Sequence, residues 1–319
     1  MLRLVIALAL ALPAVPAAAA SPAELREELA GLQRDDTRLQ SIAWRVAHGN
    51  ASLCPDPQPA VGLLPMDARG FKDPAAVRAA LGLSGELGVG AVAQGSPADL
   101  GGVKAGDELV GIEGIDFAAL PDVPPNSFAR QVALVTRIDA QLVQHGQLAL
   151  MLHTPGSVAS RRVVLKAEPV CRSSFELLTS GDQAAADGQR VVISRRFLAG
   201  APSDDEAAFV IGHELAHNIL RHRALLDKLG RTPENYRQTE RAADRLGLWL
   251  MANAGYDTAT ATSFMQRWAR RRGPILFPGT THDGWKTRQR TIAAELAVLN
   301  ATPAKPDGEL RDWRGLFPR

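Results

Sequence analysis

The stretch from Phe209 to His222, FVIGHELAHNILRH, constrains the fold more than any other part of the sequence. His213 and His217 stand four residues apart, so on a helix both imidazoles project from one face and can converge on one ion. Glu214 lies beside them. Two imidazoles and a glutamate in this HExxH spacing are typical of zinc hydrolases. Chance produces HExxH in about one chain in a hundred, so a plain helix face remains an alternative for these five residues alone.

The local signals around this motif predict its setting. Ser203 to Glu206 reads as a capping box in which Ser203 is the N-cap and Glu206 reaches back, so the helix begins about ten residues before His213. A strand is expected over Arg190 to Ser194. His222 lies about 180° around the same helix from His213, and we expect a structural role for it.

A second helix supplies carboxylates at the same spacing. A Thr-Pro start signal predicts a helix over Pro233 to Ala254, which places Glu240 and Asp244 one turn apart on one face. A catalytic zinc takes three protein ligands and a water. We therefore predict Glu240 as the third ligand, with one Zn²⁺ per chain. Asp244 is expected to accept a hydrogen bond from a ligating histidine and so to orient it.

The first twenty residues have the pattern of a secretory signal. A basic start is followed by an apolar run from Leu4 to Leu12 and by small residues up to Ala20. We expect cleavage near Ala20 and a periplasmic or secreted protein, with an uncleaved anchor as the alternative. Loss of Arg3 lowers the formal charge from +2 to +1. A chain this close to neutral has no bulk attraction for nucleic acid.

The chain has two cysteines, Cys54 and Cys171. In an oxidising compartment such a pair is expected to form a disulfide, and two buried thiols are the alternative. A bridge would pin the intervening residues at their base. Ahead of it, apolar spacing predicts an amphipathic helix over Pro22 to His48. The proline-rich segment from Cys54 to Pro65 is expected to be an irregular linker.

Residues 66–168 alternate short strand-like runs with glycine, and include one helical stretch from Ser127 to Val143. Within them, GVGAVAQGSPADLGGVKAGDELVGIEG, from Gly88 to Gly114, resembles the PDZ domain of exported bacterial proteases. The resemblance implies that an extended peptide adds as a strand beside the helix. A domain that serves as spacer or lid is the alternative.

The C-terminal half resembles the M48 family of zinc metallopeptidases, which pair HExxH with a later ExxxD and a Thr-His…Arg segment. The matching stretches here are DEAAFVIGHELAHNILRH, TERAADRLGLWLMANAGYD and TTHDGWKTRQRTI. The resemblance covers about residues 169–300. It implies that His213, His217 and Glu240 are metal ligands, that Glu214 is the general base, and that Asp244 is an orienting acid.

The resemblance also gives roles to residues outside the ligand set. His282 and Arg288 are expected at the rim of the site, where His282 would stabilise an oxyanion or act as a reversible fourth ligand. The chain differs from the family here, because Asp283 replaces the usual proline. Gln183 replaces the more common asparagine ahead of the strand Val191 to Ile193, along which substrate would add.

Two C-terminal features remain. The basic cluster from Arg267 to Arg272 is expected to be a solvated face. The proline-rich end is expected to be a mobile tail, with docking back through Trp313 and Phe317 as the alternative.

The expected fold class is α+β, with a helix-rich, zincin-type (gluzincin) peptidase domain and an inserted PDZ-like, β-rich domain. The divisions are a signal peptide over 1–20, an N-terminal helix region over 21–56 packed on the peptidase domain, a PDZ-like domain over 57–168, the peptidase domain over 169–302 and a tail over 303–319.

We predict an exported, zinc-dependent metalloendopeptidase that cleaves misfolded or envelope polypeptides, with a further peptide ligand for the PDZ-like domain. The alternative is a periplasmic chaperone or adaptor that holds client peptides through the PDZ-like domain while the metal site stays latent. Membrane contact is not indicated.

Overall fold

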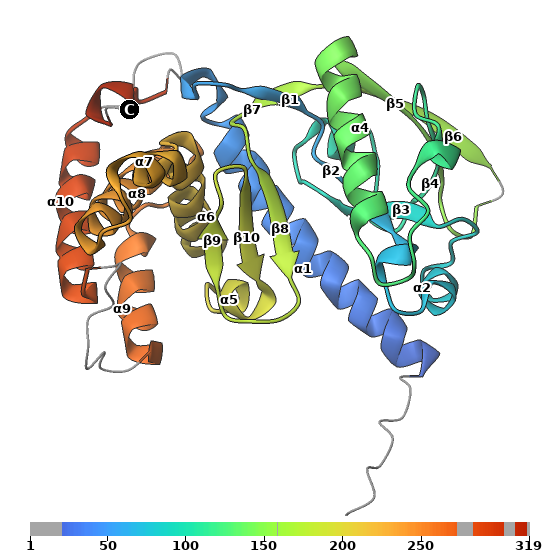
Figure 1. Cartoon of the computed structure of the whole chain (residues 1–319), viewed down its shortest axis with the longest axis horizontal. Coiled ribbons are helices and arrows are strands. Elements are labelled where there is room, and N and C mark those ends of the chain that lie inside the picture. Colours follow the sequence, from blue (N-terminus) through green and yellow to red (C-terminus); the bar gives the residue numbers. More distant parts are fainter. Residues whose placement is uncertain (1–20, 158, 273–282, 303–309, 318–319) are drawn as a thin grey trace, which may run out of the picture.

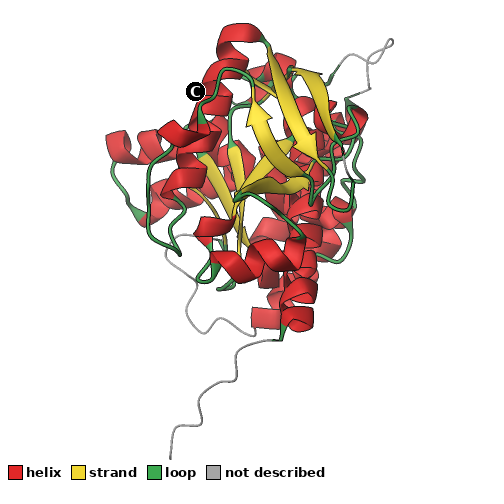
Figure 2. Ribbon diagram, turned by 90° about the vertical axis from the view of Figure 1, so that its right-hand side faces the viewer, coloured by secondary structure: helices red, strands yellow, loops and turns green. Residues whose placement is uncertain are grey.

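The computed structural model describes residues 21–157, 159–272, 283–302 and 310–317. These residues form an α+β fold, as predicted, with three separate sheets (Figure 1) and with helices packed against the strands (Figure 2). The predicted signal segment and His282 lie outside the described residues. Among those described, no helix is both long and apolar enough to cross a bilayer.

The long helix α1 (Pro22–His48) contacts both sheet-containing regions of the molecule (Figure 1). Ser21 and Glu24 form a capping box at its start. Near that end, Leu29 packs with Ala68, Val77 and Ala80 in a small apolar cluster. The other end belongs to the main core, to which it contributes Leu39, Ile42, Val46 and others. The helix therefore packs on more than the peptidase region for which it was predicted.

An antiparallel five-stranded sheet occupies the middle of the chain, in the order β2-β3-β4-β5-β6. Its strands are β2 (Leu63–Asp67), β3 (Leu87–Val92), β4 (Glu108–Ile112), β5 (Gln147–His153) and β6 (Ser160–Lys166). Three helices accompany it: α2 (Pro74–Leu81), α3 (Pro97–Leu100) and α4 (Ala129–His145). Leu134 of α4 and the alternating Leu148, Leu150 and Leu152 of β5 fill its core. We call this part the middle region.

The predicted irregular linker is wrong, because the segment from Cys54 to Pro65 carries β1 (Gln58–Ala60) and the start of β2. Proline hides the strand signal, although edge strands tolerate it. In β1, Pro59 lies opposite Pro169 of the partner strand β7 (Glu168–Val170). Neither residue has an N–H to donate, so this pair fits the non-hydrogen-bonded position of an antiparallel ladder, where no N–H is needed.

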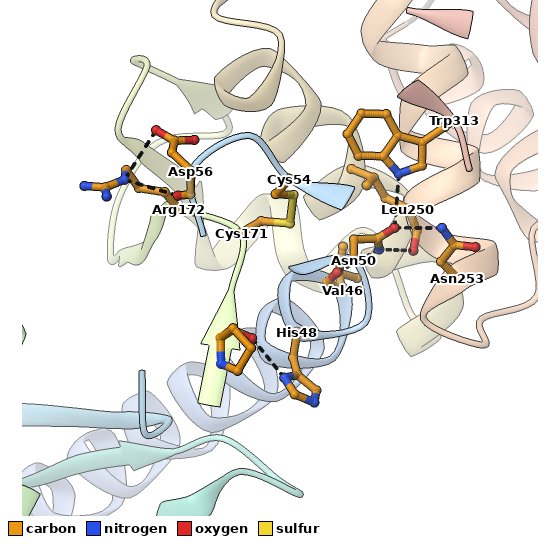
Figure 3. The surroundings of a disulfide bond; sticks show 11 residues. Val46, His48, Asn50, Cys54, Asp56, Cys171, Arg172, Leu250, Asn253 and Trp313 are labelled. Carbon is orange, nitrogen blue, oxygen red and sulfur yellow. Dashed lines mark hydrogen bonds and ion pairs between the residues drawn. A yellow bond between two sulfur atoms is a disulfide. The ribbon is translucent and has the colours of Figure 1, made fainter. Parts of the chain in front are cut away.

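The strands β1 and β7 form the neck of the middle region, and the predicted disulfide between Cys54 and Cys171 closes it (Figure 3). Beside the neck, the buried Asn50 donates from its amide to the carbonyl of Leu250 at 3.0 Å. Its Oδ1 accepts from Asn253 at 2.9 Å and from the indole N–H of Trp313 at 3.4 Å. The residues that follow α1, the helix that carries Leu250 and Asn253, and the C-terminal segment around Trp313 therefore meet here.

The end of the chain packs back on the core, as expected for its two aromatic residues. Trp313 is fully buried and Phe317 nearly so. Trp313 and Phe317 thus belong to the main core and anchor residues 310–317, so the predicted mobile tail is wrong for this segment.

The C-terminal half surrounds a three-stranded sheet in the order β8-β10-β9. The strands are β8 (Ser174–Leu178), β9 (Ala184–Ala186) and β10 (Arg190–Ser194). The helices are α5 (Arg195–Ala199), α6 (Asp204–Ile219), α7 (His222–Leu229), α8 (Pro233–Asn253), α9 (Thr260–Arg272) and α10 (Trp285–Ala301). Helices α6 and α8 match their predicted starts, with Ser203 and Thr232 as N-caps.

Two predicted details of these helices are wrong. Glu206 does not reach back to close the capping box, because it forms an ion pair with Arg267 of α9. The cluster from Arg267 to Arg272 was predicted to be a solvated face, but its first two residues contact the core. The ring of Trp268 lies 4.4 Å from that of Phe197, centroid to centroid. Burying an aromatic face and pairing a buried carboxylate both draw this end of the cluster onto the core.

Candidate metal centre

The two helices that carry the predicted ligands cross at a pair of glycines. A Cβ at Gly212 of α6 would lie 3.0 Å from the carbonyl oxygen of Gly247 on α8. A Cβ at Gly247 would lie 3.0 Å from the backbone nitrogen of His213. Both contacts are tighter than side-chain carbons normally make, so a side chain at either position would push the two backbones apart by a few tenths of an ångström. This crossing brings α8 within reach of the histidines on α6.

His213, His217 and Glu240 meet at the crossing, as predicted. The Nε2 atoms of His213 and His217 are 3.2 Å apart. Oε2 of Glu240 lies 3.3 Å from Nε2 of His213, and Oε1 of Glu240 lies 3.5 Å from Nε2 of His217. Zinc binds such atoms at about 2.0–2.2 Å, which gives a tetrahedron with edges of about 3.3–3.5 Å. The two imidazole nitrogens and the Glu240 carboxylate thus lie at distances that suit a tetrahedral zinc site, and the residues fit the metal.

Asp244 supports the first histidine. Its Oδ1 lies 2.9 Å from Nδ1 of His213, and the residue is almost completely buried. Arg288 of α10 donates two hydrogen bonds to the same carboxylate, at 2.6 and 2.8 Å. Burial would raise the pKa of Asp244, but Arg288 and His213 hold it well below its usual value. Asp244 is therefore an anion that can accept the Nδ1 proton and leave Nε2 of His213 free to bind a cation.

The electrostatics of the metal-free site favour a positive charge at its centre. Burial lowers the pKa of His213, but hydrogen bonds to Asp244 and Glu240 outweigh it and raise the pKa to about 10. Burial and the neighbouring His213 lower the pKa of His217 to about 3. His213 thus carries an extra proton, whose positive charge lies between the Asp244 and Glu240 carboxylates. A divalent cation bound by the same atoms would replace that proton.

Glu214 is buried on α6 beside His213, at the edge of this cluster. Burial would lower the pKa of Arg288, but the charges of Asp244, Glu240 and Glu214 raise it above its usual value. Glu214 is therefore close enough to Arg288 to act on its charge. Glu214 directly follows His213 on α6, and its role as general base stays a prediction.

The predicted substrate strand is wrong. Val191 to Ile193 belong to β10, which pairs with β8 on one side and with β9 on the other. Both of its edges are occupied, so no peptide can add to it. Sequence alone shows that a strand precedes α6, but not which strands flank it.

In the three-stranded sheet, the edge strand nearest helix α6, which carries His213 and His217, is β9 (Figure 1). The N–H of Ser194 donates to Gln183, and the N–H of Asp187 donates to Arg190. In an antiparallel ladder every second residue faces the partner strand, so Ala184 and Ala186 direct their N–H and C=O groups outward. No strand pairs with this outer edge within the described part of the chain.

The opposite edge of the sheet is covered. Gln40 of α1 donates from Nε2 to the carbonyl oxygen of Phe175 in β8 at 2.8 Å. Helix α1 also lies along β8. The edge at β9 is therefore the one that remains open to an added strand in the described structure.

The residue at the usual proline position has a partner of its own. Asp283 accepts two hydrogen bonds from Arg241, at 2.6 and 3.0 Å. Arg241 directly follows Glu240 on α8, so the start of α10 is held next to a candidate ligand.

His222 is the site residue that the sequence reasoning missed. Helix α6 ends at Ile219, Arg221 has a φ of 54°, and α7 starts at His222. This corner turns the His222 ring toward His217, and their Nδ1 atoms are 2.9 Å apart. No glycine or proline stands between Asn218 and His222, so the sequence gives no helix-breaking signal at this position.

A hollow of about 600 Å³ lies at the corner between α6 and α7, beside the disulfide. Its lining carries charges of both signs, from Asp56, Asp187, Asp227, Arg172, Arg221 and Arg223. None of the three candidate ligands lines it, so the hollow is separate from the metal centre.

Comparison with known proteins gives a match for one segment of the C-terminal half. No curated protein and no solved structure matches the chain. A family model described as peptidase family M48 matches residues 183–231. The matched segment runs from β9 to the end of α7 and contains HExxH, but it ends before Glu240. The match supports the M48 resemblance and indicates a metal-dependent peptidase in general terms.

Proposed function

We propose that this chain is an exported zinc metalloendopeptidase of the M48 type. The observation that carries the proposal is the convergence of three side chains: the Nε2 atoms of His213 and His217 are 3.2 Å apart, and the Glu240 carboxylate has one oxygen 3.3 Å from the first and the other oxygen 3.5 Å from the second. Ligands that come from two helices and meet at the edge lengths of a zinc tetrahedron favour a catalytic centre over two unrelated helix faces.

The roles of the side chains follow from their positions. His213, His217 and Glu240 would hold zinc, and bound zinc would supply Lewis acidity toward a peptide carbonyl. Glu214 would accept a proton from the attacking water and return it to the departing amine. Asp244, held by two hydrogen bonds from Arg288, keeps His213 in the tautomer that binds a cation. These roles make the reaction a hydrolysis of peptide bonds.

The outer edge of β9 is the proposed substrate site. An extended polypeptide adds there through the backbone groups of Ala184 and Ala186, next to α6. Recognition through main-chain hydrogen bonds has little dependence on substrate sequence, and it requires an unfolded stretch. Misfolded or envelope polypeptides are therefore the proposed substrate class.

The structure gives the chaperone or adaptor alternative less support. In the middle region, helix α4 lies beside the edge strand β2, where a PDZ-like groove would be. Pro65, in the centre of β2, has no N–H, and its carbonyl already accepts a hydrogen bond from Gln131 at 2.9 Å. A peptide adding along β2 would therefore find neither partner at this position. The open edge lies at the candidate metal centre instead.

The exported location rests on the signal-like first twenty residues together with the disulfide. A bridge between Cys54 and Cys171 is stable in an oxidising compartment such as the periplasm. The PDZ-like identity of the middle region remains part of the proposal.

The test compares Glu214→Gln with wild type. We expect wild type and variant to bind one zinc each, and we expect the variant to cleave a dye-labelled unfolded protein about 10³-fold more slowly. Glu234→Gln is the matched control, because Glu234 is exposed on α8. Equal cleavage by wild type and Glu214→Gln would sink the catalytic assignment.

A further inference from the structure

Two neighbouring imidazoles meet nitrogen to nitrogen beneath the metal centre. Nδ1 of His222 lies 2.9 Å from Nδ1 of His217, and His222 is 4% exposed. At this distance one nitrogen must carry a proton and the other must accept it, because two lone pairs would repel. One ring is therefore the hydrogen-bond donor and the other the acceptor, and this assignment determines which nitrogen of His217 keeps its lone pair.

The opposite side of the His217 ring settles the direction. Its Nε2 lies 3.2 Å from Nε2 of His213 and 3.5 Å from Glu240, within the set of donors that fits zinc. This step rests on the proposed function. A nitrogen that binds a cation keeps its lone pair, so the ring proton of His217 must be on Nδ1. His217 then donates to Nδ1 of His222.

We propose that His222 is the positioning residue of His217, as Asp244 is of His213. Each ligating imidazole has its Nδ1 held from behind, one by a carboxylate and the other by a neutral imidazole. Such partners fix the tautomer and the ring orientation of a ligand. His222 is itself no ligand, because its Nδ1 meets the side of the His217 ring that faces away from the metal donors.

The backbone supports the same assignment. On an unbroken helix, His222 would lie on the far side from His213. Arg221 instead adopts a φ of 54°, a conformation that residues with side chains rarely adopt. Arg221 makes no side-chain cap for α7. The unfavourable backbone turns the ring of His222 toward His217, and strain at such a corner is common near functional sites.

The experiment compares His222→Asn with His222→Leu. The Oδ1 of asparagine stands as many bonds from Cβ as Nδ1 of histidine does, so it can accept the same hydrogen bond. Leucine has the shape of asparagine without the acceptor. Zinc affinity is measured for the purified chains by competition with a chelator. We expect His222→Leu to bind zinc about 10–100-fold more weakly than wild type, and His222→Asn to recover most of this loss.

Melting of the metal-free proteins shows whether both variants fold. Wild-type affinity in His222→Leu would overturn the proposal. So would equal losses in the two variants, because a role in packing alone gives no rescue by asparagine. A wild-type chain that binds no zinc would refute the proposed function itself, which separates the two failures.

Discussion

The C-terminal half and the middle region each place a helix beside a sheet with a strand at its edge, but the two edges differ. In β9 the outward residues are Ala184 and Ala186, which keep both backbone groups available. In β2, Pro65 lacks an N–H and Gln131 occupies its carbonyl. Whether a sheet edge can accept another chain is thus decided by a few backbone groups, and similar architecture does not imply similar binding.

Buried aspartates in the two regions differ as well. Burial raises the pKa of Asp67 in the middle region, despite its hydrogen bonds to Arg130 at 3.1 and 3.2 Å. Burial acts in the same direction on Asp244, but Arg288 and His213 lower its pKa. The partners of Asp244 lie closer, at 2.6 to 2.9 Å, and keep this aspartate of the candidate metal centre ionised, as an acceptor for a candidate ligand must be.

Among changes that test this comparison, closing the open edge should produce the largest effect. Ala186→Pro removes an outward N–H and leaves the pairing with β10 intact, because that N–H does not face β10. Losing a main-chain hydrogen bond and adding a ring at the edge should lower kcat/KM for unfolded protein by about tenfold or more. Zinc content should not change.

Ala186→Ser is the matched control for this prediction, since it keeps the N–H at nearly the same size. Unaltered activity in Ala186→Pro would show that substrate does not add along β9.

The converse change should open the closed edge. Pro65→Ala restores an N–H, and Gln131→Leu frees the carbonyl of residue 65. Both changes are made in a chain that also carries Ala186→Pro, which removes binding at β9, and Glu214→Gln, which removes cleavage. Relative to that chain with native β2, binding of an extended apolar peptide should strengthen by at most about tenfold. Fluorescence anisotropy measures it. If the chain with native β2 already binds such a peptide tightly, the inference that the β2 edge is closed to an added strand is wrong.

The smallest effect is expected on α1, the helix that contacts both regions. Asp36 lies between Gln33, which donates to Val89 of β3, and Gln40, which donates to Phe175 of β8. Burial, with help from the charge of Asp35, raises the pKa of Asp36 to about 7. The folded chain therefore binds one more proton than the unfolded chain between about pH 4 and pH 7, and its stability falls as pH rises through this window.

Asp36→Asn removes that penalty. Each pKa unit corresponds to about 1.4 kcal/mol, and solvent screening on this partly exposed face reduces it, so we expect stabilisation by about 1–2 kcal/mol at pH 8. Near pH 4 the variant and wild type should unfold at the same denaturant concentration. Glu27→Gln on the same helix should show no such dependence on pH, and a similar pH dependence in that control would rule out burial of Asp36 as the cause.

Much of the metal centre could be predicted from local signals. The spacing of His213, His217 and Glu214 requires only a helix, and the caps at Ser203 and Thr232 locate the starts of both helices. The order of the strands could not be predicted, because β10 has the same short apolar pattern whether it is central or at an edge. β2 was missed because Pro65 suppresses the strand signal in a position that an edge tolerates.

The sequence by itself determined the candidate donor set, since metal-binding residue types at helical spacing depend on local periodicity alone. Tertiary structure decided how the donors meet and what supports them. Gly212 and Gly247 bring the two helices together, and the corner at Arg221 turns His222 onto His217. The physical reason is that periodicity is a property of neighbours in the chain, whereas the crossing of α6 and α8 and the open edge at β9 depend on contacts between distant segments.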